Sequence, residues 1–177
     1  EQGFHPAQVG DIATAAGVSR ATFYNYFSSK EELLRHMVQE ALPDLMATRL
    51  SAVRASTPLD RIRASTEAYL EAYERHAVLM HIWNEAAQRS PEMAALLQDA
   101  RRPFLERTEQ SIRRLQESGI ADPALDARYA AHALTGMVAS FAFTWFVEGQ
   151  EFDRETAVDV LCRLWANAIG LGSAARG

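Results

Sequence analysis

The chain has 177 residues, enough for one medium-sized domain or for a small domain joined to a larger one. Hydrophobic residues make up 48% of the chain and charged residues 23%, a composition that excludes an intrinsically disordered protein. The formal net charge of −5 gives no support to nucleic-acid binding, so such a function has to be argued from a motif.

The single cysteine, Cys162, excludes an intramolecular disulfide and is typical of proteins in a reducing cytoplasm. No signal peptide is visible at the start of the sequence. The longest apolar run, residues 133–147, is interrupted by polar residues and is shorter than the roughly 20 residues that a membrane helix needs. We therefore predict a cytoplasmic protein without a membrane span.

Residues 8–30 predict two short helices joined by a tight turn, the arrangement of a helix-turn-helix. Gly17 stands at the turn, where glycine tolerates a positive φ, and Ser19 is a typical N-cap for the second helix. Phe23 and Phe27, four residues apart, are expected to face inward. Val18 is expected to pack into the angle between the two helices.

The polar side of this second helix carries residue types that bind DNA. Arginine can donate to guanine, asparagine to adenine, and alanine or the threonine methyl can contact a thymine methyl. Tyrosine and threonine hydroxyls, and a lysine at the start of the next helix, can bind phosphates. A helical hairpin without any DNA-binding role would carry a similar generic pattern. The predicted DNA-binding residues are Gln8, Arg20, Ala21, Thr22, Tyr24, Asn25, Tyr26 and Lys30.

The stretch from Ile12 to Leu34 resembles the DNA-binding domain of the TetR family of one-component bacterial regulators. Its matching residues read I-A-x-x-A-G-V-S-x-x-T-F-Y-x-Y-F-x-S-K-E-x-L-L. In that family an often basic N-terminal arm and a first helix precede this motif, and residues 1–4 resemble the end of such a helix. We therefore expect that the arm and most of this helix are absent from the chain. Their absence would explain why residues 1–40 contain three basic and five acidic residues.

Helical patterns and caps continue through the rest of the chain, and no strand-like alternation persists. Capping boxes at residues 28–32 start a long helix, in which Pro43 is expected to cause a kink or a bend. Further helices are expected to start at Thr57–Pro58, after a break at His76–Ala77, and at Ser90–Pro91.

The last part of the chain predicts three long helical segments. Pro103 is expected to kink or divide the first of them. Asp122–Pro123 is expected to start a helix that runs to about Glu148, and Asp153 to cap the last one, which ends at Gly170.

The resemblance implies an all-α protein with a homeodomain-like helix-turn-helix domain at residues 1–42 and a helical ligand-binding and dimerisation domain at residues 43–177. The helix expected beyond residue 130 is apolar on nearly every side and therefore needs cover on every side. In the family the last two helices pack against the same helices of a second copy. The alternative is a monomer in which these helices are part of its own hydrophobic core. The candidate interface residues are Ala133, Gly136, Ser140, Val158, Leu161 and Trp165.

Aromatic and methionine side chains are concentrated in the middle helices. They could be ordinary core residues, but the resemblance implies that several line an apolar ligand pocket. His81 and Glu85 lie one helical turn apart and could both bind a metal ion. Two candidate ligands without a third do not predict a metal site. We expect no metal and no cofactor. The candidate pocket residues are Tyr69, Tyr73, Met80, Trp83, Phe104, Met137, Phe141 and Trp145.

The sequence has no nucleophile elbow, phosphate-binding glycine loop or His/Cys cluster, so we do not expect an enzyme. The resemblance implies a homodimeric regulator at the bacterial nucleoid, most often a repressor, that leaves a palindromic operator when a small, largely apolar molecule binds the body. An alternative is a DNA-binding dimer whose body binds a protein partner. A closed, well-packed body would favour this alternative, and an internal cavity would favour the small-molecule regulator. A third alternative, a helical-bundle enzyme, predicts no affinity for promoter DNA.

Overall fold

The computed structural model describes residues 7–46 and 57–171, and within these ranges it contains eight α-helices and no strand. The predicted all-α fold class is therefore confirmed. The expectation for residues 1–4 lies outside the described residues. The helices are α1 Val9–Ala15, α2 Arg20–Tyr26, α3 Lys30–Leu45, α4 Pro58–Arg75, α5 Ala77–Arg89, α6 Pro91–Glu117, α7 Ala127–Phe146 and α8 Arg154–Ala168.

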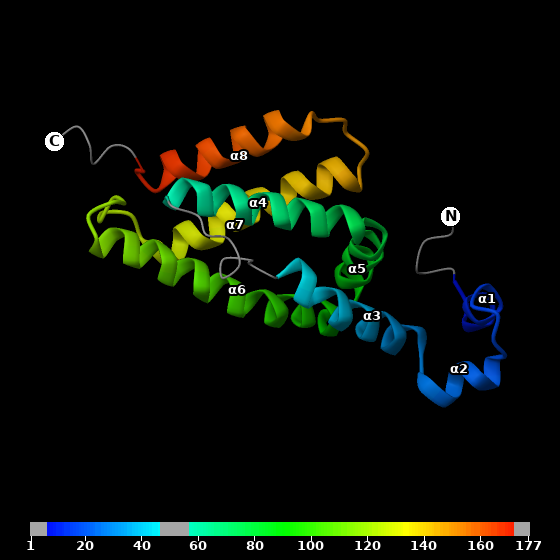
Figure 1. Ribbon diagram of the computed structural model, residues 1–177. Helices are drawn as coiled ribbons and strands as arrows, with labels where there is room; N and C mark the ends of the chain where they lie inside the picture. Colours follow the sequence, from blue (N-terminus) through cyan, green and yellow to red (C-terminus); the bar gives the residue numbers. More distant parts are fainter. Residues whose placement is uncertain (1–6, 47–56, 172–177) are drawn as a thin grey trace.

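The helices form a small head and a larger body (Figure 1). Helices α1 and α2 make up the head at one end, and α3 leads from them along the body formed by α4 to α8. The C-terminal end of α8 lies at the opposite end of the molecule from the head. No helix in the described ranges is long and apolar enough to cross a membrane. The fold thus connects the head to the body through one helix, α3.

Two apolar clusters form the core of the body. The larger one joins α3, α4, α5 and α8 around the fully buried side chains of Val38, Leu70, Trp83 and Leu161. The smaller one joins α6, α7 and α8 around Ile112 and small residues of α7. Each large buried side chain contributes about 1.5–3 kcal/mol of hydrophobic free energy. Because Val38 is in the larger cluster, α3 is part of this core and does not simply cross its surface.

Most of the predicted helix starts are confirmed. The Thr57 hydroxyl accepts a hydrogen bond from the Asp60 N–H at 3.1 Å, with Pro58 as the first residue of α4. Ser90 caps α6 and Asp153 caps α8 in the same way. His76 separates α4 from α5, as predicted. Local capping chemistry therefore sets these boundaries.

The predicted start of α7 at Asp122–Pro123 is wrong, because Asp126 caps this helix. The Asp126 carboxylate accepts from the N–H groups of Arg128 and Tyr129 at 2.9 and 3.1 Å. Asp122 instead holds a turn: its carboxylate accepts from the Ala124 N–H at 2.8 Å, and its own N–H donates to the carbonyl of Ile169 at 2.9 Å. The contact with the end of α8 is a tertiary one, which the local sequence does not reveal.

Both internal prolines lie within continuous helices. Pro43 is inside the last part of α3, and Pro103 is inside α6, which it does not divide. The two prolines line the same small cleft of about 330 Å³ between α3 and α6. The proposed domain boundary at residue 42 also falls within α3. This boundary stays a prediction, because α3 packs against the body along much of its length.

Candidate DNA-binding surface and ligand cavity

The head has the turn and the caps that its sequence predicts. Gly17 has a φ of 69° at the turn between α1 and α2. The Ser19 hydroxyl accepts from the Thr22 N–H at 3.0 Å and so caps α2. Phe23 is buried and packs on the half-buried Phe27, with 5.7 Å between the ring centroids. Val18 differs from its prediction: its side chain is 41% exposed, because the angle between α1 and α2 does not enclose it.

One side of α2 presents its predicted DNA-binding residues to solvent. Arg20, Ala21 and Asn25 are exposed, and Tyr24 and Tyr26 are exposed by 52% and 75%. The Tyr24 ring contacts Phe23 and the Tyr26 ring contacts Phe27, and among the described residues half or more of each tyrosine side chain stays exposed. An exposed polar and aromatic helix face is what major-groove and phosphate contacts require.

The remaining three predicted DNA-binding residues have local partners. The hydroxyl of half-buried Thr22 lies 2.9 Å from that of Ser19. Gln8 is exposed, and its backbone N–H donates to the Asp11 carboxylate at 3.1 Å. The Lys30 ammonium donates to the Ala7 carbonyl at 3.1 Å, which ties the start of α3 to the beginning of α1. A phosphate contact by these three residues stays a prediction.

The body contains a cavity of about 600 Å³ between α4, α6, α7 and the C-terminal part of α8. Its size is in the range of small-molecule sites in proteins. Most of its wall is apolar, and hydroxyl and guanidinium groups interrupt it. Its lining includes Met46, Arg61, Ser65, Tyr69, Arg101, Phe104, Arg107, Ser111, Gly136 and Trp165.

Of the eight candidate pocket residues, only Tyr69 and Phe104 line this cavity. Tyr73, Met80 and Trp83 are buried in the larger core cluster instead. The Trp83 ring N–H donates to the carbonyl of Met93 at 3.2 Å, which joins α5 to α6. For these three residues the ordinary core interpretation is the correct one.

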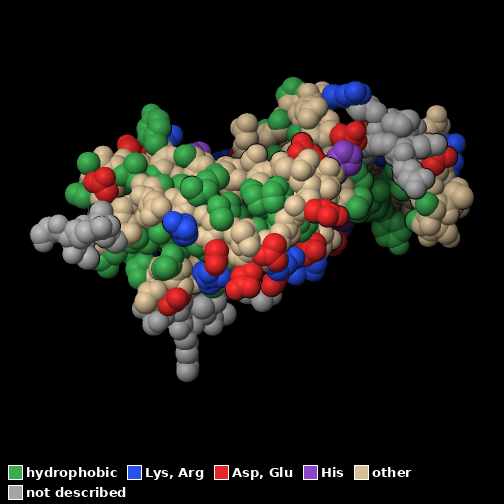
Figure 2. Space-filling model, turned by 90° about the horizontal axis from the view of Figure 1, so that it is seen from above, with side chains coloured by type: hydrophobic (Ala, Val, Ile, Leu, Met, Phe, Trp, Pro, Cys, Tyr) green, Lys and Arg blue, Asp and Glu red, His purple; other side chains and the backbone are tan. Residues whose placement is uncertain are grey.

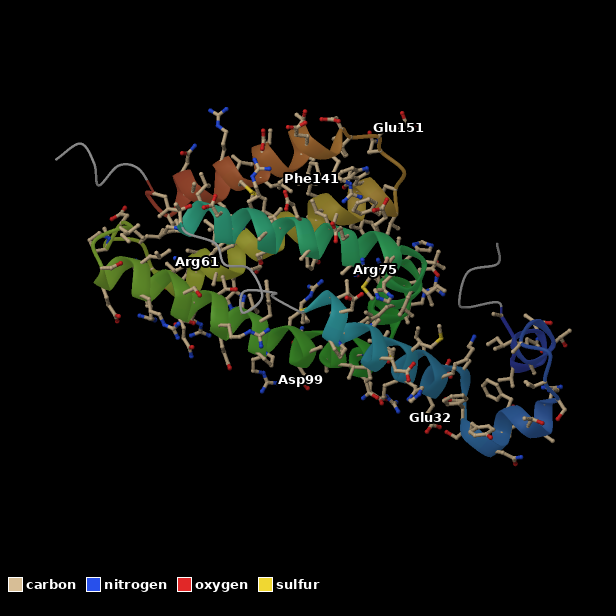
Figure 3. The ribbon with its side chains drawn as sticks, viewed as in Figure 1. Glu32, Arg61, Arg75, Asp99, Phe141 and Glu151 are labelled. Carbon is tan, nitrogen blue, oxygen red and sulfur yellow. The ribbon has the colours of Figure 1, made fainter. Side chains whose placement is uncertain are left out.

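The α7 candidates Met137, Phe141 and Trp145 are also outside the cavity lining. Met137 packs against both core clusters. Phe141 stacks with Phe152, whose ring centroid lies 4.6 Å away, and Trp145 contacts the same ring. Figure 3 shows Phe141 nearer to Glu151 than to Arg61. This aromatic cluster anchors the connection between α7 and α8.

Apart from Tyr69, the polar residues of the cavity are not among the residues predicted from the sequence. Arg61, Ser65 and Tyr69 follow each other at four-residue intervals on α4, so they share one face of that helix. Arg101 and Ser111 contribute from α6. A search for polar residues at helical spacing beside an apolar stripe could have found the α4 set. The pairing of α4 with α6 was not visible in the local sequence.

Burial raises the pKa of the Tyr69 hydroxyl, and the nearby positive charge of Arg101 acts in the opposite direction. Tyr69 is therefore protonated at neutral pH and can donate a hydrogen bond into the cavity. Burial likewise raises the pKa of the Cys162 thiol in the core, so this thiol is protonated and is not a nucleophile.

The end of α3 is bound to the cavity wall and to the body. Met46, the C-cap residue of α3, lines the cavity, and the Arg107 guanidinium donates to its carbonyl at 3.2 Å. Arg75 forms a bidentate ion pair with Asp44, with a closest distance of 2.9 Å. This hydrogen bonding by Arg75, with a further bond from His76, lowers the pKa of the Asp44 carboxyl.

A second link fixes the middle of α3. The Arg35 guanidinium donates to the Glu92 carboxylate in the first turn of α6 at 2.5 Å. The polar candidates near the pocket are used structurally as well, since the Asn84 amide donates to the Met80 carbonyl at 2.8 Å. No group of three His, Cys, Asp or Glu side chains among the described residues could hold a metal ion.

The outer face of α7 and α8 differs from the predicted dimer interface on α8. Ala133, Gly136 and Ser140 are exposed on α7, as a contact surface requires. Val158 and Leu161 are buried within the protomer, so they cannot contact a second copy. The reason is that the more regular apolar stripe of α8 faces α4. The ion pairs Arg63–Asp159 and Arg154–Glu74 also join α8 to α4.

The exposed apolar residues of α8 are Val160 and Leu164, each 47% exposed, and Tyr129 on α7 is 76% exposed. Trp165 is half-buried and lines the cavity. Figure 2, seen from the α8 side of the molecule, shows hydrophobic side chains gathered along the middle of this face and charged side chains along one edge. We call Tyr129, Val160 and Leu164 the outer apolar face.

Two family models match the chain. Residues 1–37 match "Bacterial regulatory proteins, tetR family", and residues 62–170, more than half of the chain, match "Transcriptional regulator EthR, C-terminal domain". The HTH-type transcriptional activator FasR of Mycolicibacterium smegmatis is 29% identical over 161 residues, which cover 90% of this chain and 72% of that protein. The HTH-type transcriptional repressor KstR2 of Mycobacterium tuberculosis is 33% identical over 90 residues, 50% of this chain and 45% of that protein.

A solved structure has the same fold as this chain. The fatty acid degradation regulator FadR from Bacillus halodurans aligns with a TM-score of 0.81 at 23% identity, over 93% of this chain and 86% of that one. The family matches cover both the head and the body that the structure describes. The chain therefore belongs to the TetR family: it is a DNA-binding transcriptional regulator and not an enzyme.

Proposed function

We propose that the protein is a ligand-responsive repressor. It binds a near-palindromic operator as a homodimer and leaves it when a small, largely apolar molecule occupies the cavity. The observation that carries this proposal is that Met46, at the end of α3, forms part of the cavity wall. A ligand in the cavity would thus contact Met46, which belongs to the helix that carries the head.

The mechanism follows from the three links of α3. In the absence of ligand, the bonds to Asp44, Arg35 and the Met46 carbonyl hold α3 at one angle against the body. A ligand beside Met46 and Arg107 favours another packing of α3 and so changes the distance between the two heads of a dimer. It can shift the equilibrium only by its differential affinity, and a hundredfold loss of DNA affinity requires about 2.7 kcal/mol.

The dimer that we propose uses the outer apolar face together with Ala133, Gly136 and Ser140. A two-fold axis there would place two α2 helices on successive major grooves of one DNA face, ~34 Å apart. Exposed apolar side chains on two neighbouring helices are a typical signal of a protein interface. A DNA-bound regulator of this kind would work in the bacterial cytoplasm, at the nucleoid.

A cavity of this size favours a small-molecule effector over a body that only binds a protein partner, because the latter would have no need of such a cavity between its helices. The relatives include a named activator, FasR, and a named repressor, KstR2. We propose repression because it is the commoner mode in this family. A reporter gene under the protein's own upstream DNA distinguishes repression from activation. If the protein is a repressor, deletion of its gene should raise expression of the reporter.

The proposal is tested by fluorescence anisotropy of the full-length protein on its own upstream DNA, with and without a deproteinised extract of the source bacterium. We expect nanomolar binding without extract and at least tenfold weaker binding with it. Ser111→Phe, which fills the cavity from α6, should bind DNA normally and lose the response to extract. Gln110→Phe, exposed on the same helix, is the matched control and should keep the response. A Ser111→Phe protein that still responds would exclude the cavity as the effector site.

A further inference from the structure

The cavity is lined by four arginines and, among the described residues, by no aspartate or glutamate. The arginines are Arg61 on α4 and Arg101, Arg107 and Arg114 on α6. The whole chain has a net charge of −5, so this local excess of positive charge is opposite to the average. A guanidinium group placed beside an apolar wall costs free energy unless a negative partner compensates it.

The two half-buried arginines of the cavity, Arg61 and Arg101, have no ion-pair partner among the described residues. Arg107 and Arg114 are exposed, and Arg107 donates to a backbone carbonyl and not to a carboxylate. Outside the cavity, six of the ten described arginines pair with carboxylates. These paired arginines are Arg35, Arg63, Arg75, Arg102, Arg113 and Arg154.

Neutral hydrogen-bond donors accompany these two arginines. Ser65 and Tyr69 lie one and two turns beyond Arg61 on the same face of α4, and Ser111 lines the cavity from α6. The protonated Tyr69 hydroxyl can donate to an anion, and it lies close enough to Arg101 to feel its charge. Figure 3 shows Arg61 in the space between α4 and α6. Donors from two helices therefore line one cavity.

The rest of the wall is apolar, with Ile62, Leu105, Val138 and Ile169 among its residues. We propose that the effector is an amphipathic anion: an apolar chain or ring system that ends in a carboxylate or phosphate group, which Arg61 and Arg101 bind. Guanidinium groups bind such anions through charge-assisted, often bidentate hydrogen bonds. This inference rests on the proposed function, since it names the chemical class of the molecule that fills the cavity.

The test uses four probes with the same ten-carbon chain: decanoate, decyl phosphate, 1-decanol and decyltrimethylammonium, each below its micelle concentration. Binding to the full-length protein is followed by tryptophan fluorescence, to which Trp165 in the cavity wall contributes. We expect at least one anion to bind tenfold more tightly than the alcohol, a difference of about 1.4 kcal/mol. The cation should bind more weakly than the alcohol. Whichever of decanoate and decyl phosphate binds more tightly shows whether the effector is a free acid or a phosphate ester.

Substitutions assign the anion to its arginines. Arg61→Gln and Arg101→Gln should each weaken binding of the preferred anion at least tenfold and leave binding of 1-decanol unchanged, which also shows that the cavity is intact. Arg89→Gln, exposed at the end of α5, is the control and should change neither affinity.

Equal affinities for anion and alcohol, tighter binding of the cation, no binding of either anion, or unchanged anion binding in both variants would each overturn the inference. The proposed function would still be tested separately, by the response of DNA binding to the extract. A negative result in one experiment therefore does not decide the other.

Discussion

Tyr24 illustrates how one side chain on α2 can have a role in recognition without a role in folding. Its ring meets Phe23 edge to face, with 5.6 Å between the centroids, yet half of the side chain remains in solvent. The buried neighbour, Phe23, stabilises the head. Tyr24 adds little to that core, and its hydroxyl is free to reach a phosphate or a base edge.

We therefore expect Tyr24→Ala to weaken operator binding about fivefold to tenfold, the cost of one lost hydrogen bond and its contact area. The melting temperature should change by less than about 1 °C, since exposed substitutions change stability little. Anisotropy on labelled operator DNA and circular dichroism measure the two effects. Val78→Ala, exposed on α5, should change neither. Wild-type affinity in the Tyr24 variant would show that α2 does not contact DNA.

Single residues were predictable where their role is local. Ser19, Thr57, Ser90 and Asp153 cap their helices by bonding backbone groups three positions away, and the sequence alone contains both partners. The role of Arg61 was not predictable. It depends on which helix comes to lie opposite α4, and an arginine on an amphipathic helix is ordinarily on its solvated side.

At the scale of elements, α3 depends on Asp44 for its fastening to α4. The Asp44 pKa is lower in the folded protein than in the unfolded chain, where an aspartate titrates near pH 3.9. The stabilisation is thus complete above that pH and is lost as the pH falls through the lower, folded-state pKa. It amounts to at most about 1 kcal/mol, because both side chains are more than a third exposed and water screens the pair.

Asp44→Asn should accordingly lower the melting temperature at pH 7 by about 1–4 °C, and the difference from wild type should shrink as the pH falls through the lowered, folded-state pKa of Asp44. Glu71→Gln, an exposed substitution on α4, should leave the melting curve unchanged at pH 7. Thermal melts of the three proteins across this pH range provide the measurement. A difference that stays constant down to pH 2.5 would mean that Asp44 acts by its shape and not by its charge.

The start of α7 gives a second test at this scale. Asp126→Ala removes the cap of a long helix and should cost about 1 kcal/mol of unfolding free energy. Asp122→Ala leaves every helix cap in place and should cost less than half as much. Urea denaturation compares the two variants. The opposite order would restore the boundary that the sequence predicted.

This pair also shows why helix boundaries were the less predictable part of the fold. Asp122 and Asp126 both precede residues that can form a helix, so each is an acceptable N-cap. The choice between them is made by the Asp122 N–H, which bonds to the last turn of α8 more than forty residues away. Hydrophobic periodicity and capping gave the number and order of the helices; tertiary contacts moved their ends.

At the scale of the whole molecule, the proposed dimer depends on the outer apolar face. Leu164→Glu would place a charge at the centre of this face, and we expect a monomer in sedimentation velocity at micromolar concentration. Because each half-site then binds alone, operator affinity should fall at least tenfold. Val78→Glu puts the same charge on an equally exposed site of α5 and should leave the dimer intact. A dimeric Leu164→Glu protein would move the interface elsewhere.

The α8 half of this face was mispredicted for a simple reason. The stripe of Val158 and Leu161 is the more regular one in sequence, and it packs against α4 of the same chain. The residues left outside, Val160 and Leu164, look like an incidental second stripe. Two adjacent apolar stripes on one helix do not reveal, without the fold, which of them faces the protomer's own core.

Among the described residues, the cavity lining contains none that precedes Met46, and the exposed side of α2 lies wholly before it. Under the proposed function, DNA recognition and effector recognition therefore depend on separate parts of the chain. Mutations on α2 can redirect the regulator to new genes while its sensory chemistry persists, and mutations in the body can retune the sensor under the same genes. Descendants of one such gene can thus diversify along two independent axes, with α3 as the shared constraint.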